Sequence, residues 1–365
     1  MSKRHRLAIA LLVPAGIAAM VVGGIAVGGT KPSSADLEIG PVVVEARKLE
    51  GFDVVDPGHT RFGKLTWRGG MVLTSSSPNF GGWSGIALDS DGAGLLAISD
   101  AGAWMQGRIS YDATGQPSGL DNVRMGPLLS DTGEPLTKKK ERDAEAITLL
   151  RGSVKSGEAL VSFERDHRIV HYGVGEDGLS KAGDEVKLPE EADDTGRNAG
   201  IEAIAIMRGG PRAGSLVAIS EGLREDGNHV GWIWIDDEPQ RFTITNPDEF
   251  DVTDATSLPD GTLLVLERRF RVSEGVRSRL RRIAPGELQP GAKIDAEVLL
   301  TADRSREIDN MEGIAAHVTP NGETVVTLIS DNNFNPALQR TLLLQFSIAA
   351  EGKAASGVRP TETAN

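Results

Sequence analysis

A motif that recurs at intervals of 52 to 61 residues constrains the fold of this chain more than any other feature. Each copy has an apolar or small residue, an oxygen-bearing side chain, then Ala or Gly, and a β-rich apolar run. The five oxygen-bearing positions are Ser84, Glu145, Glu202, Asp254 and Glu312. Self-similarity at about 50 residues, with several strands in each unit, is typical of a β-propeller.

Short apolar runs divided by turn residues surround each motif. Asp-Gly or Asn-Gly stands between such runs at Asp91-Gly92, Asp260-Gly261 and Asn321-Gly322, and these dipeptides are strong hairpin signals. No segment shows a long apolar period of 3.6 residues. The chain is therefore expected to be all-β.

The repeat predicts a β-propeller with five or six blades, each of about four antiparallel strands. The competing architecture is one antiparallel sandwich, in which five copies in register would be a coincidence. Residues 41–76 hold further strand-like runs. These runs either complete the last blade by circular closure or supply a sixth blade.

In a propeller, the residue entering the first strand and the residue leaving the second lie at the same end of the hairpin. The second strand of each unit ends in an acid, and these acids are Asp100, Glu164, Glu221, Glu267 and Asp331. Together with the five motif positions, they would place ten side chains around one mouth of the channel. Nine of the ten are carboxylic acids.

So many carboxylates at one opening cannot all be ionised without compensation, because two like charges about 4 Å apart repel by about 4 kcal/mol at an effective dielectric constant near 20. Raised pKa values, arginine pairing or divalent cations would relieve the repulsion. An oxygen-only ligand set suits Ca²⁺, or Mg²⁺ with fewer ligands. The predicted calcium ligands are Asp100, Glu145, Glu202, Asp254, Glu267, Glu312 and Asp331. The alternative is a structural ring in which each acid bonds to backbone N–H groups or to an arginine.

Basic side chains accompany the acids. Arg165 and His167 follow Glu164, Arg268 follows Glu267, and Arg197 precedes Glu202. If they share the mouth, they would form a trap for an anionic ester, with Glu164 or Glu221 as general base. Strand alternation opposes this arrangement, since Arg165 and Arg268 would point away from the preceding acids unless the strand has already ended.

Composition narrows the class of partner. The chain has 39 Lys+Arg and 52 Asp+Glu, a net charge of −13, and no cysteine. A general nucleic-acid or anionic-membrane binder needs a basic footprint, so the charge argues against both classes. The lack of cysteine excludes thiolate zinc sites and a Cys nucleophile. The expected partner is an anionic small-molecule ester or phosphoester, and the chain is expected to be a monomer.

The two ends differ from the repeat. Residues 1–6 are basic and residues 7–29 are apolar, so residues 1–35 predict either a cleaved signal peptide or a retained membrane anchor. Residues 36–348 are assigned to the propeller, and residues 349–365 are expected to be a disordered tail. The domain is therefore expected to be periplasmic or secreted, with residues 7–29 as its tether to the inner membrane if they are retained.

The repeats resemble the "esterase-like activity of phytase" family of phytase-like domains. The likeness rests on Trp83-Ser84-Gly85-Ile86 with Ser99-Asp100, on Asp143 to Ile147 with Ser162 to Ile169, on Glu202-Ala203-Ile204 with Ser220-Glu221-Gly222, and on Glu312-Gly313-Ile314 with Ser330 to Phe334. It covers roughly residues 80–347. The resemblance implies an exported bacterial propeller, and the family's name suggests calcium and ester or phosphoester hydrolysis. The fourth unit and Ser84 depart from the pattern, which puts a fully symmetric metal ring in doubt.

Two functions of different classes follow from these patterns. The first is a calcium-dependent hydrolase of phosphate or carboxylate esters, with Glu164, Glu221, Arg165, His167 and Arg268 as its catalytic residues. The second is a non-catalytic exported propeller that binds a ligand or protein partner, with the acids in a structural role. Ser84 is a poor candidate for a serine nucleophile because the final glycine of a nucleophile elbow is missing.

Overall fold

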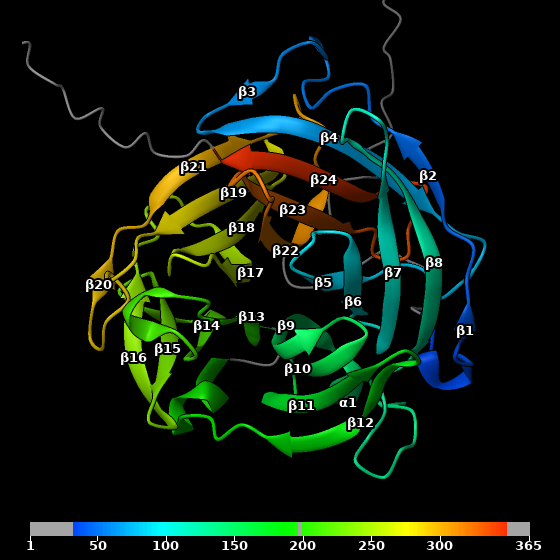
Figure 1. Cartoon of the computed structure of the whole chain (residues 1–365). Coiled ribbons are helices and arrows are strands. Elements are labelled where there is room, and N and C mark those ends of the chain that lie inside the picture. Colours follow the sequence, from blue (N-terminus) through cyan, green and yellow to red (C-terminus); the bar gives the residue numbers. More distant parts are fainter. Residues whose placement is uncertain (1–31, 196–198, 349–365) are drawn as a thin grey trace, which may run out of the picture.

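The computed structural model describes residues 32–195 and 199–348, and within them the predicted all-β propeller is confirmed. Five sheets, antiparallel except for the short β16–β20 pair, are arranged around a central axis (Figure 1). The blade count, which the sequence left open, is five. The expected signal or anchor segment, Arg197 and the expected C-terminal tail lie largely or wholly outside the described residues.

Each blade begins with its innermost strand, except that blades 1 and 5 also take strands from the N-terminal side of the chain. Blade 1 contains β5 (Trp83–Leu88), β6 (Gly94–Ser99), β7 (Ala103–Tyr111), β8 (Pro117–Pro127) and the edge strand β1 (Gly40–Pro41). Blade 2 contains β9 (Ala144–Ser153), β10 (Ser156–Phe163), β11 (Arg168–Gly175) and β12 (Gly178–Glu185). Blade 3 contains β13 (Ile201–Ile206), β14 (Leu216–Glu225), β15 (Asn228–Ile235), β16 (Glu238–Ile244) and β20 (Lys293–Ile294). Blade 4 contains β17 (Asp251–Ser257), β18 (Leu263–Arg271), β19 (Gly275–Ile283) and β21 (Glu297–Ala302).

Blade 5 closes the ring by joining the two ends of the described chain. Its strands β22 (Asn310–Val318), β23 (Thr324–Asp331) and β24 (Thr341–Ile348) pair onward with β4 (Leu65–Thr74) and β2 (Glu45–Lys48). β3 (Arg61–Phe62) pairs with β4 as well. The strand-like runs in residues 41–76 therefore complete the last blade and do not form a sixth.

Helical structure in the described ranges is limited to connections. These are the 3₁₀ turns η1 (Ser34–Asp36), η2 (Glu190–Thr195) and η3 (Gly210–Arg212), and the short helix α1 (Lys139–Arg142). Within residues 32–195 and 199–348, no helix has the length and apolar character needed to cross a membrane.

Every innermost strand has a β-bulge near its first residues. In blade 1, for example, Trp83 pairs with Ser99 and Gly85 with Ile98, so Ser84 is the extra residue. A bulge re-aims the side chain of its extra residue. The same irregularity occurs at Glu202, at Glu312 and, in blade 2, at Glu145 with Ala146. The oxygen-bearing motif positions are therefore mostly bulge positions.

Blade 4 corrects the sequence alignment by one residue. Val252 pairs with Glu267 and Asp254 with Leu266, so the bulged residue is Thr253 and not Asp254. Because side chains alternate along a strand, this shift changes the direction of the acid. The buried Asp254 carboxylate accepts hydrogen bonds from the backbone N–H groups of Ala255 and Ile314, both at 2.8 Å. It thus connects the inner strands of blades 4 and 5.

The small residue of the motif is explained by the close contact between neighbouring inner strands. A Cβ added to Gly85 would lie 2.9 Å from the backbone nitrogen of Ile147 in blade 2. A Cβ added to Gly313 would lie 3.1 Å from the backbone nitrogen of Ile86 in blade 1. Asp254 stands at the equivalent place in blade 4, where its carboxylate reaches the N–H of Ile314.

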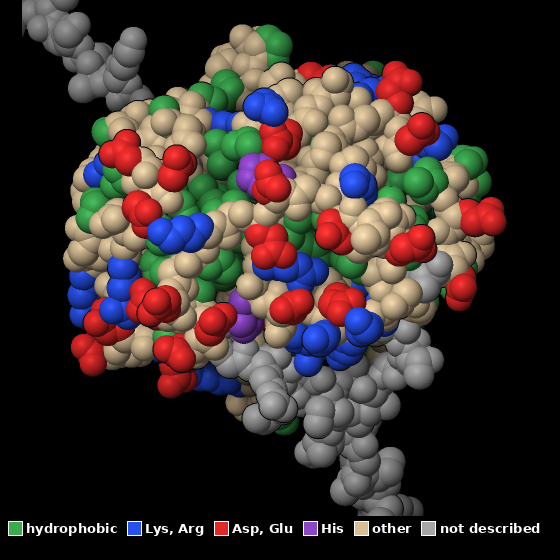
Figure 2. All heavy atoms as spheres, turned by 90° about the horizontal axis from the view of Figure 1, so that it is seen from below, with side chains coloured by type: hydrophobic (Ala, Val, Ile, Leu, Met, Phe, Trp, Pro, Cys, Tyr) green, Lys and Arg blue, Asp and Glu red, His purple; other side chains and the backbone are tan. Residues whose placement is uncertain are grey.

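Around these strands, the core is divided into apolar clusters that fill the spaces between blades. One cluster, for instance, packs Leu96 and Ile98 of blade 1 against Ile147 and Val161 of blade 2. The surface is different in character. Figure 2 shows acidic and basic side chains interspersed over one side of the molecule, so much of the excess negative charge is spread over the exterior.

We predict that Asp254→Ala lowers the free energy of unfolding by about 1–3 kcal/mol, because the N–H of Ile314 loses its acceptor in a buried place. Urea denaturation would measure this change. Asp184→Ala, at an exposed position on β12, is the matched control and should change stability by less than about 0.5 kcal/mol. Equal effects of the two substitutions would contradict the bridging role of Asp254.

Candidate active site at the channel mouth

One residue in or directly after the second strand of each blade occupies an equivalent position at the mouth. In every blade, the residue before the bulge of the inner strand pairs with a residue of the second strand, and the mouth residue comes directly after that partner. The mouth residues are Asp100, Glu164, Glu221, Arg268 and Asp331. Four blades supply an acid and blade 4 supplies Arg268. The mouth therefore has an arginine where the sequence alignment had placed Glu267.

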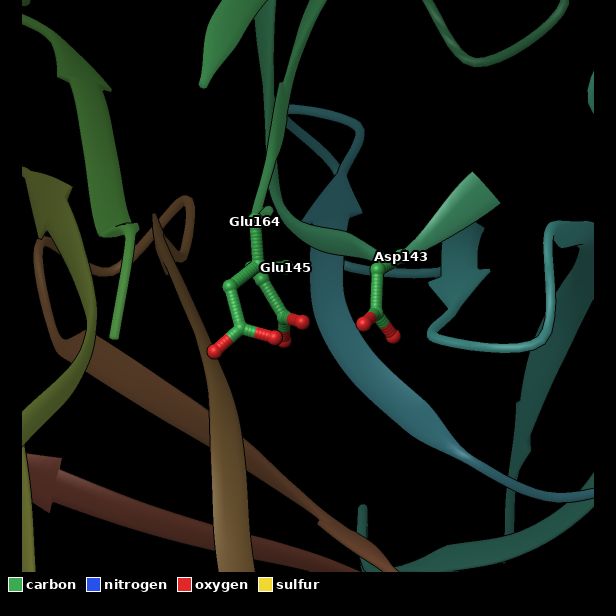
Figure 3. A group of neighbouring side chains, drawn as sticks. All are labelled: Asp143, Glu145 and Glu164. Atoms are coloured by element: carbon green, nitrogen blue, oxygen red, sulfur yellow. The ribbon is translucent and has the colours of Figure 1, made fainter. Parts of the chain in front are cut away.

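Three carboxylates from blade 2 and its entry loop converge. Asp143, Glu145 and Glu164 each offer an oxygen atom within 4.8 Å of the other two (Figure 3). Asp143 and Glu164 are buried, and Glu145 is half-buried. The backbone N–H of Glu164 donates to the carbonyl of Asp143 at 2.8 Å, which fixes the end of β10 beside the start of β9.

Asp143 was not among the predicted site residues. It stands two positions before the bulged Glu145 and directly before the first aligned residue, Ala144, so it lies outside the alignment of the five copies. The sequence signal that could have identified Asp143 is strand periodicity, since residues two apart on an extended chain, such as Asp143 and Glu145, share a face.

Burial and mutual repulsion disfavour the ionised forms of Glu145, Glu164 and Glu202. Burial, then the neighbouring Glu202 and Asp143, raises the pKa of Glu145 well above its usual range. Burial and Asp143 raise the pKa of Glu164 to about 8. The pKa of Glu202 is also raised well above normal, first by burial and then by Glu221 and Glu164. The acids therefore form an electrostatically connected band from blade 2 into blade 3.

Arg268 adjoins this band from blade 4. Its Nη1 lies 3.3 Å from Glu312 Oε1 and donates to Asn310 Oδ1. Burial would lower the pKa of Arg268, but Glu312 and Glu221 raise it above its ordinary value. Burial raises the pKa of Glu221 to about 7, although Arg268 opposes this shift. A permanently charged guanidinium thus lies next to a carboxyl group that titrates near neutrality.

Arg165 also shares the mouth, because β10 has ended before it. Its φ of 65° turns the chain out of the strand. The Arg165 Nε donates to Asp143 Oδ2 and lies 3.4 Å from Glu164 Oε2. The expected obstacle of strand alternation therefore does not apply to Arg165.

The remaining predicted residues lie at or near the junctions between blades. Asp100 contributes to the raised pKa of Glu145, so it neighbours the carboxylate trio. His167 lies close to Glu164, because a Cβ on Gly200 would be 3.3 Å from His167 Nδ1 and 3.0 Å from Glu164 Cα. Asp331 is buried and accepts the N–H of Asn333 at 2.6 Å.

Glu267 does not line the mouth, contrary to the sequence expectation. It is fully buried, accepts a hydrogen bond from Arg279 Nε, and lies 3.2 Å from Arg281 Nη1. His229 of blade 3 is 3.9 Å away. Glu267 is therefore the centre of a buried ion-pair cluster between blades 3 and 4. Together with Asp254, it is one of two predicted metal ligands that the structure places elsewhere.

The fold and the mouth define the class of this protein as a five-bladed β-propeller whose channel opening joins buried carboxylates to arginines. The family model for phytase-like proteins, described as esterase-like activity of phytase, matches residues 78–334. This range includes all the mouth positions of the five blades and more than two thirds of the chain. The chain belongs to this family, as its motifs suggested. No curated protein was found to match it.

We predict that, without divalent cations, thermal stability falls as the pH rises from about 4.5 to 8. Glu164 and Glu221 have folded-state pKa values of about 8 and 7, above the ordinary value of 4.5. The native state therefore binds more protons than the unfolded state in this window, and raising the pH favours unfolding. The melting temperature measured across this range would test the slope. The double variant Glu164→Gln and Glu221→Gln should flatten it, and an unchanged slope in that variant would contradict the assignment.

We also predict that neutralising an acid affects stability differently in the ion-pair cluster around Glu267 and in the carboxylate trio that contains Glu145. Glu267→Gln should lower the free energy of unfolding by about 3–5 kcal/mol, because Arg279 and Arg281 are left as buried charges without their partner. Glu145→Gln should not lower it at pH 8 in the presence of a chelator, because it removes a carboxylate from a group of like charges. Urea unfolding of both variants would measure the difference, and the reverse order would contradict this division of the acids.

Proposed function

We propose that this protein is an exported hydrolase of phosphate or carboxylate esters that uses Ca²⁺ at the channel mouth. The observation that carries the proposal is the convergence of Asp143, Glu145 and Glu164 beside the Arg165 guanidinium, with Arg268 next to Glu312 in another blade of the same mouth. Acidic ligands for a cation and basic groups for an anionic substrate are the two requirements of metal-assisted ester hydrolysis. Membership of a family described by esterase-like activity supports the same reaction class.

The donor set fits a hard cation. Asp143, Glu145 and Glu164 offer only oxygen atoms, which Ca²⁺ prefers, and they would hold the ion. Burial and then the neighbouring carboxylates raise the pKa values of Glu145 and Glu164, so added positive charge at this place would favour their ionised forms. When bound, the cation would polarise the ester oxygen and lower the pKa of a water molecule. Arg165 already neutralises part of the charge of Asp143, so the cation would depend most on Glu145 and Glu164.

The protein's own residues supply binding and proton transfer. Arg268 would hold an anionic oxygen of the substrate, since its guanidinium is charged at every physiological pH. Glu221 would act as general base, because a carboxyl group with a pKa of about 7 is half ionised at neutral pH. Glu164, the other base that the sequence indicates, would hold the cation, so the proton transfer is assigned to Glu221. Glu164 is buried and Glu221 is half-buried, so access of bulk water to both carboxyl groups is limited.

A binding function without catalysis is the second proposal. It is favoured by the acids that already have protein partners, such as Glu312 with Asn310 Nδ2 at 2.7 Å and Glu202 with the N–H of Gly200 at 3.0 Å. In that case the acids would stabilise the junctions between blades, and the mouth would recognise a ligand through Arg268.

We predict that the purified protein hydrolyses an aryl phosphate, an aryl carboxylate ester or phytate in the presence of Ca²⁺ and loses this activity with a chelator. Glu221→Gln should lower kcat by about 10²- to 10⁴-fold, the usual contribution of a general base. Glu225→Gln, on the same hairpin but exposed, is the matched control and should keep its activity within about twofold.

The two proposals give different results in these assays. An absence of turnover with every substrate, together with a melting temperature indifferent to Ca²⁺, would refute the hydrolase. Turnover that persists in the chelator would retain the hydrolase and reject the cation.

A further inference from the structure

Each mouth residue lies opposite a residue at the start of its own blade, in the inner strand or directly before it. These opposite residues are, in blade order, Gly82, Asp143, Gly200, Asp251 and Asn310. Asp251 is therefore the counterpart in blade 4 of Asp143 in the carboxylate trio. Asp143 lies opposite Glu164, whereas Asp251 is paired across the strands with Arg268. Side chains of directly opposite residues are neighbours, so this position adjoins an acid in blade 2 and an arginine in blade 4.

Arg224 brings a second guanidinium group to Asp251 from blade 3. From Ile219 to Arg224, β14 advances by five residues while β15 advances by two, so three residues of β14 are extra. Extra residues bend a strand and re-aim its side chains. Arg224 Nη2 donates to Asp251 Oδ1 at 2.7 Å. One carboxylate therefore adjoins arginines from two neighbouring blades.

Arg224 is fixed from the protein side. Its cross-strand partner is His229, which is fully buried, and Arg224 Nη1 lies 2.9 Å from His229 Nε2. Burial and then Arg224 lower the pKa of His229 to about 2, so the ring is neutral and one of its nitrogens can accept a hydrogen bond. The Asp251 side chain is instead 47% exposed. The guanidinium group is thus held in place, while its carboxylate partner is open to solvent.

The two arginines stabilise the Asp251 carboxylate only weakly. Burial raises the pKa of Asp251, although Arg224 and Arg268 both oppose the shift. Desolvation therefore costs the ionised form more than the two guanidinium groups return. Among the described residues, Arg268 makes its hydrogen bond through Nη1, to Asn310, which leaves Nε and Nη2 for a ligand. An oxyanion with several acceptor oxygens can bind both guanidinium groups at once.

We propose that Arg224 and Arg268 together bind the anionic group of the substrate, and that Asp251 occupies this place until the substrate displaces it. The inference rests on the anion-binding role proposed above for Arg268, and it adds a second guanidinium and an internal competitor. It uses neither the cation nor the proton transfer. The ligand class is an oxyanion, for which inorganic phosphate is the probe.

Titration calorimetry of the full chain with inorganic phosphate, without divalent cations, tests this site. Asp251→Asn should tighten phosphate binding by at least about fivefold, because the competing carboxylate loses its charge. Arg224→Gln should weaken it by at least about tenfold, the usual effect of losing a hydrogen bond to a charged group. Glu249→Gln is the matched control, since Glu249 is exposed and paired with Arg271 at 2.6 Å. In about 0.15 M salt it should change the affinity by less than about 1.5-fold, because exposed charges are screened.

Asp251→Asn decides the question even if Arg224→Gln is destabilised, because misfolding cannot raise an affinity. The proposal is overturned if Asp251→Asn binds phosphate no more tightly than the parent chain, or if Glu249→Gln tightens binding equally.

The site and the proposed hydrolase can fail separately. The expected phosphate affinities without turnover of any ester would refute the hydrolase and retain the site. Turnover with Ca²⁺, together with phosphate affinities that ignore both substitutions, would retain the hydrolase and refute the site.

Discussion

The close contact of five inner strands around one axis is the constraint on which the rest of the structure depends. At that contact only a small residue fits after the bulge, as Gly85 and Gly313 show, unless the larger side chain finds a partner in the next blade, as Asp254 does. The bulge in turn aims the side chain of its own extra residue, which stands directly before the small residue, into the mouth. Packing near the axis and the chemistry of the opening are thus set by the same few residues of each repeat.

The acids of this protein divide into two electrostatic situations. Glu267 lies between Arg279 and Arg281, so its negative charge is compensated where it is buried. Burial first, and then neighbouring carboxylates, raises the pKa values of Glu145 and Glu164, and Arg165 offsets the shift of Glu164 only in part. Compensated burial is expected of a structural ion pair, whereas uncompensated burial is frequent at functional sites. This contrast separates residues that the sequence repeat had grouped together.

Sequence periodicity sufficed for the architecture, because five copies of one motif specify a propeller whatever their detailed register. It also aligned Glu145, Glu202 and Glu312 with one another, and the structure shows all three at bulge positions. It failed in blade 4, where Thr253 interrupts the pairing and a shift of one residue exchanges Glu267 for Arg268 at the mouth. Bulge positions and the positive φ of Arg165 depend on backbone detail that residue type does not encode.

Blade 5 has a consequence for how the ring is assembled. Its β24 pairs with β4, and some 270 residues of chain separate Leu65–Thr74 from Thr341–Ile348. Contacts between segments so distant in sequence form slowly, and this one cannot form until almost the whole chain has been synthesised. The circle therefore closes last during biosynthesis. Proteolytic loss of either end would open the same seam.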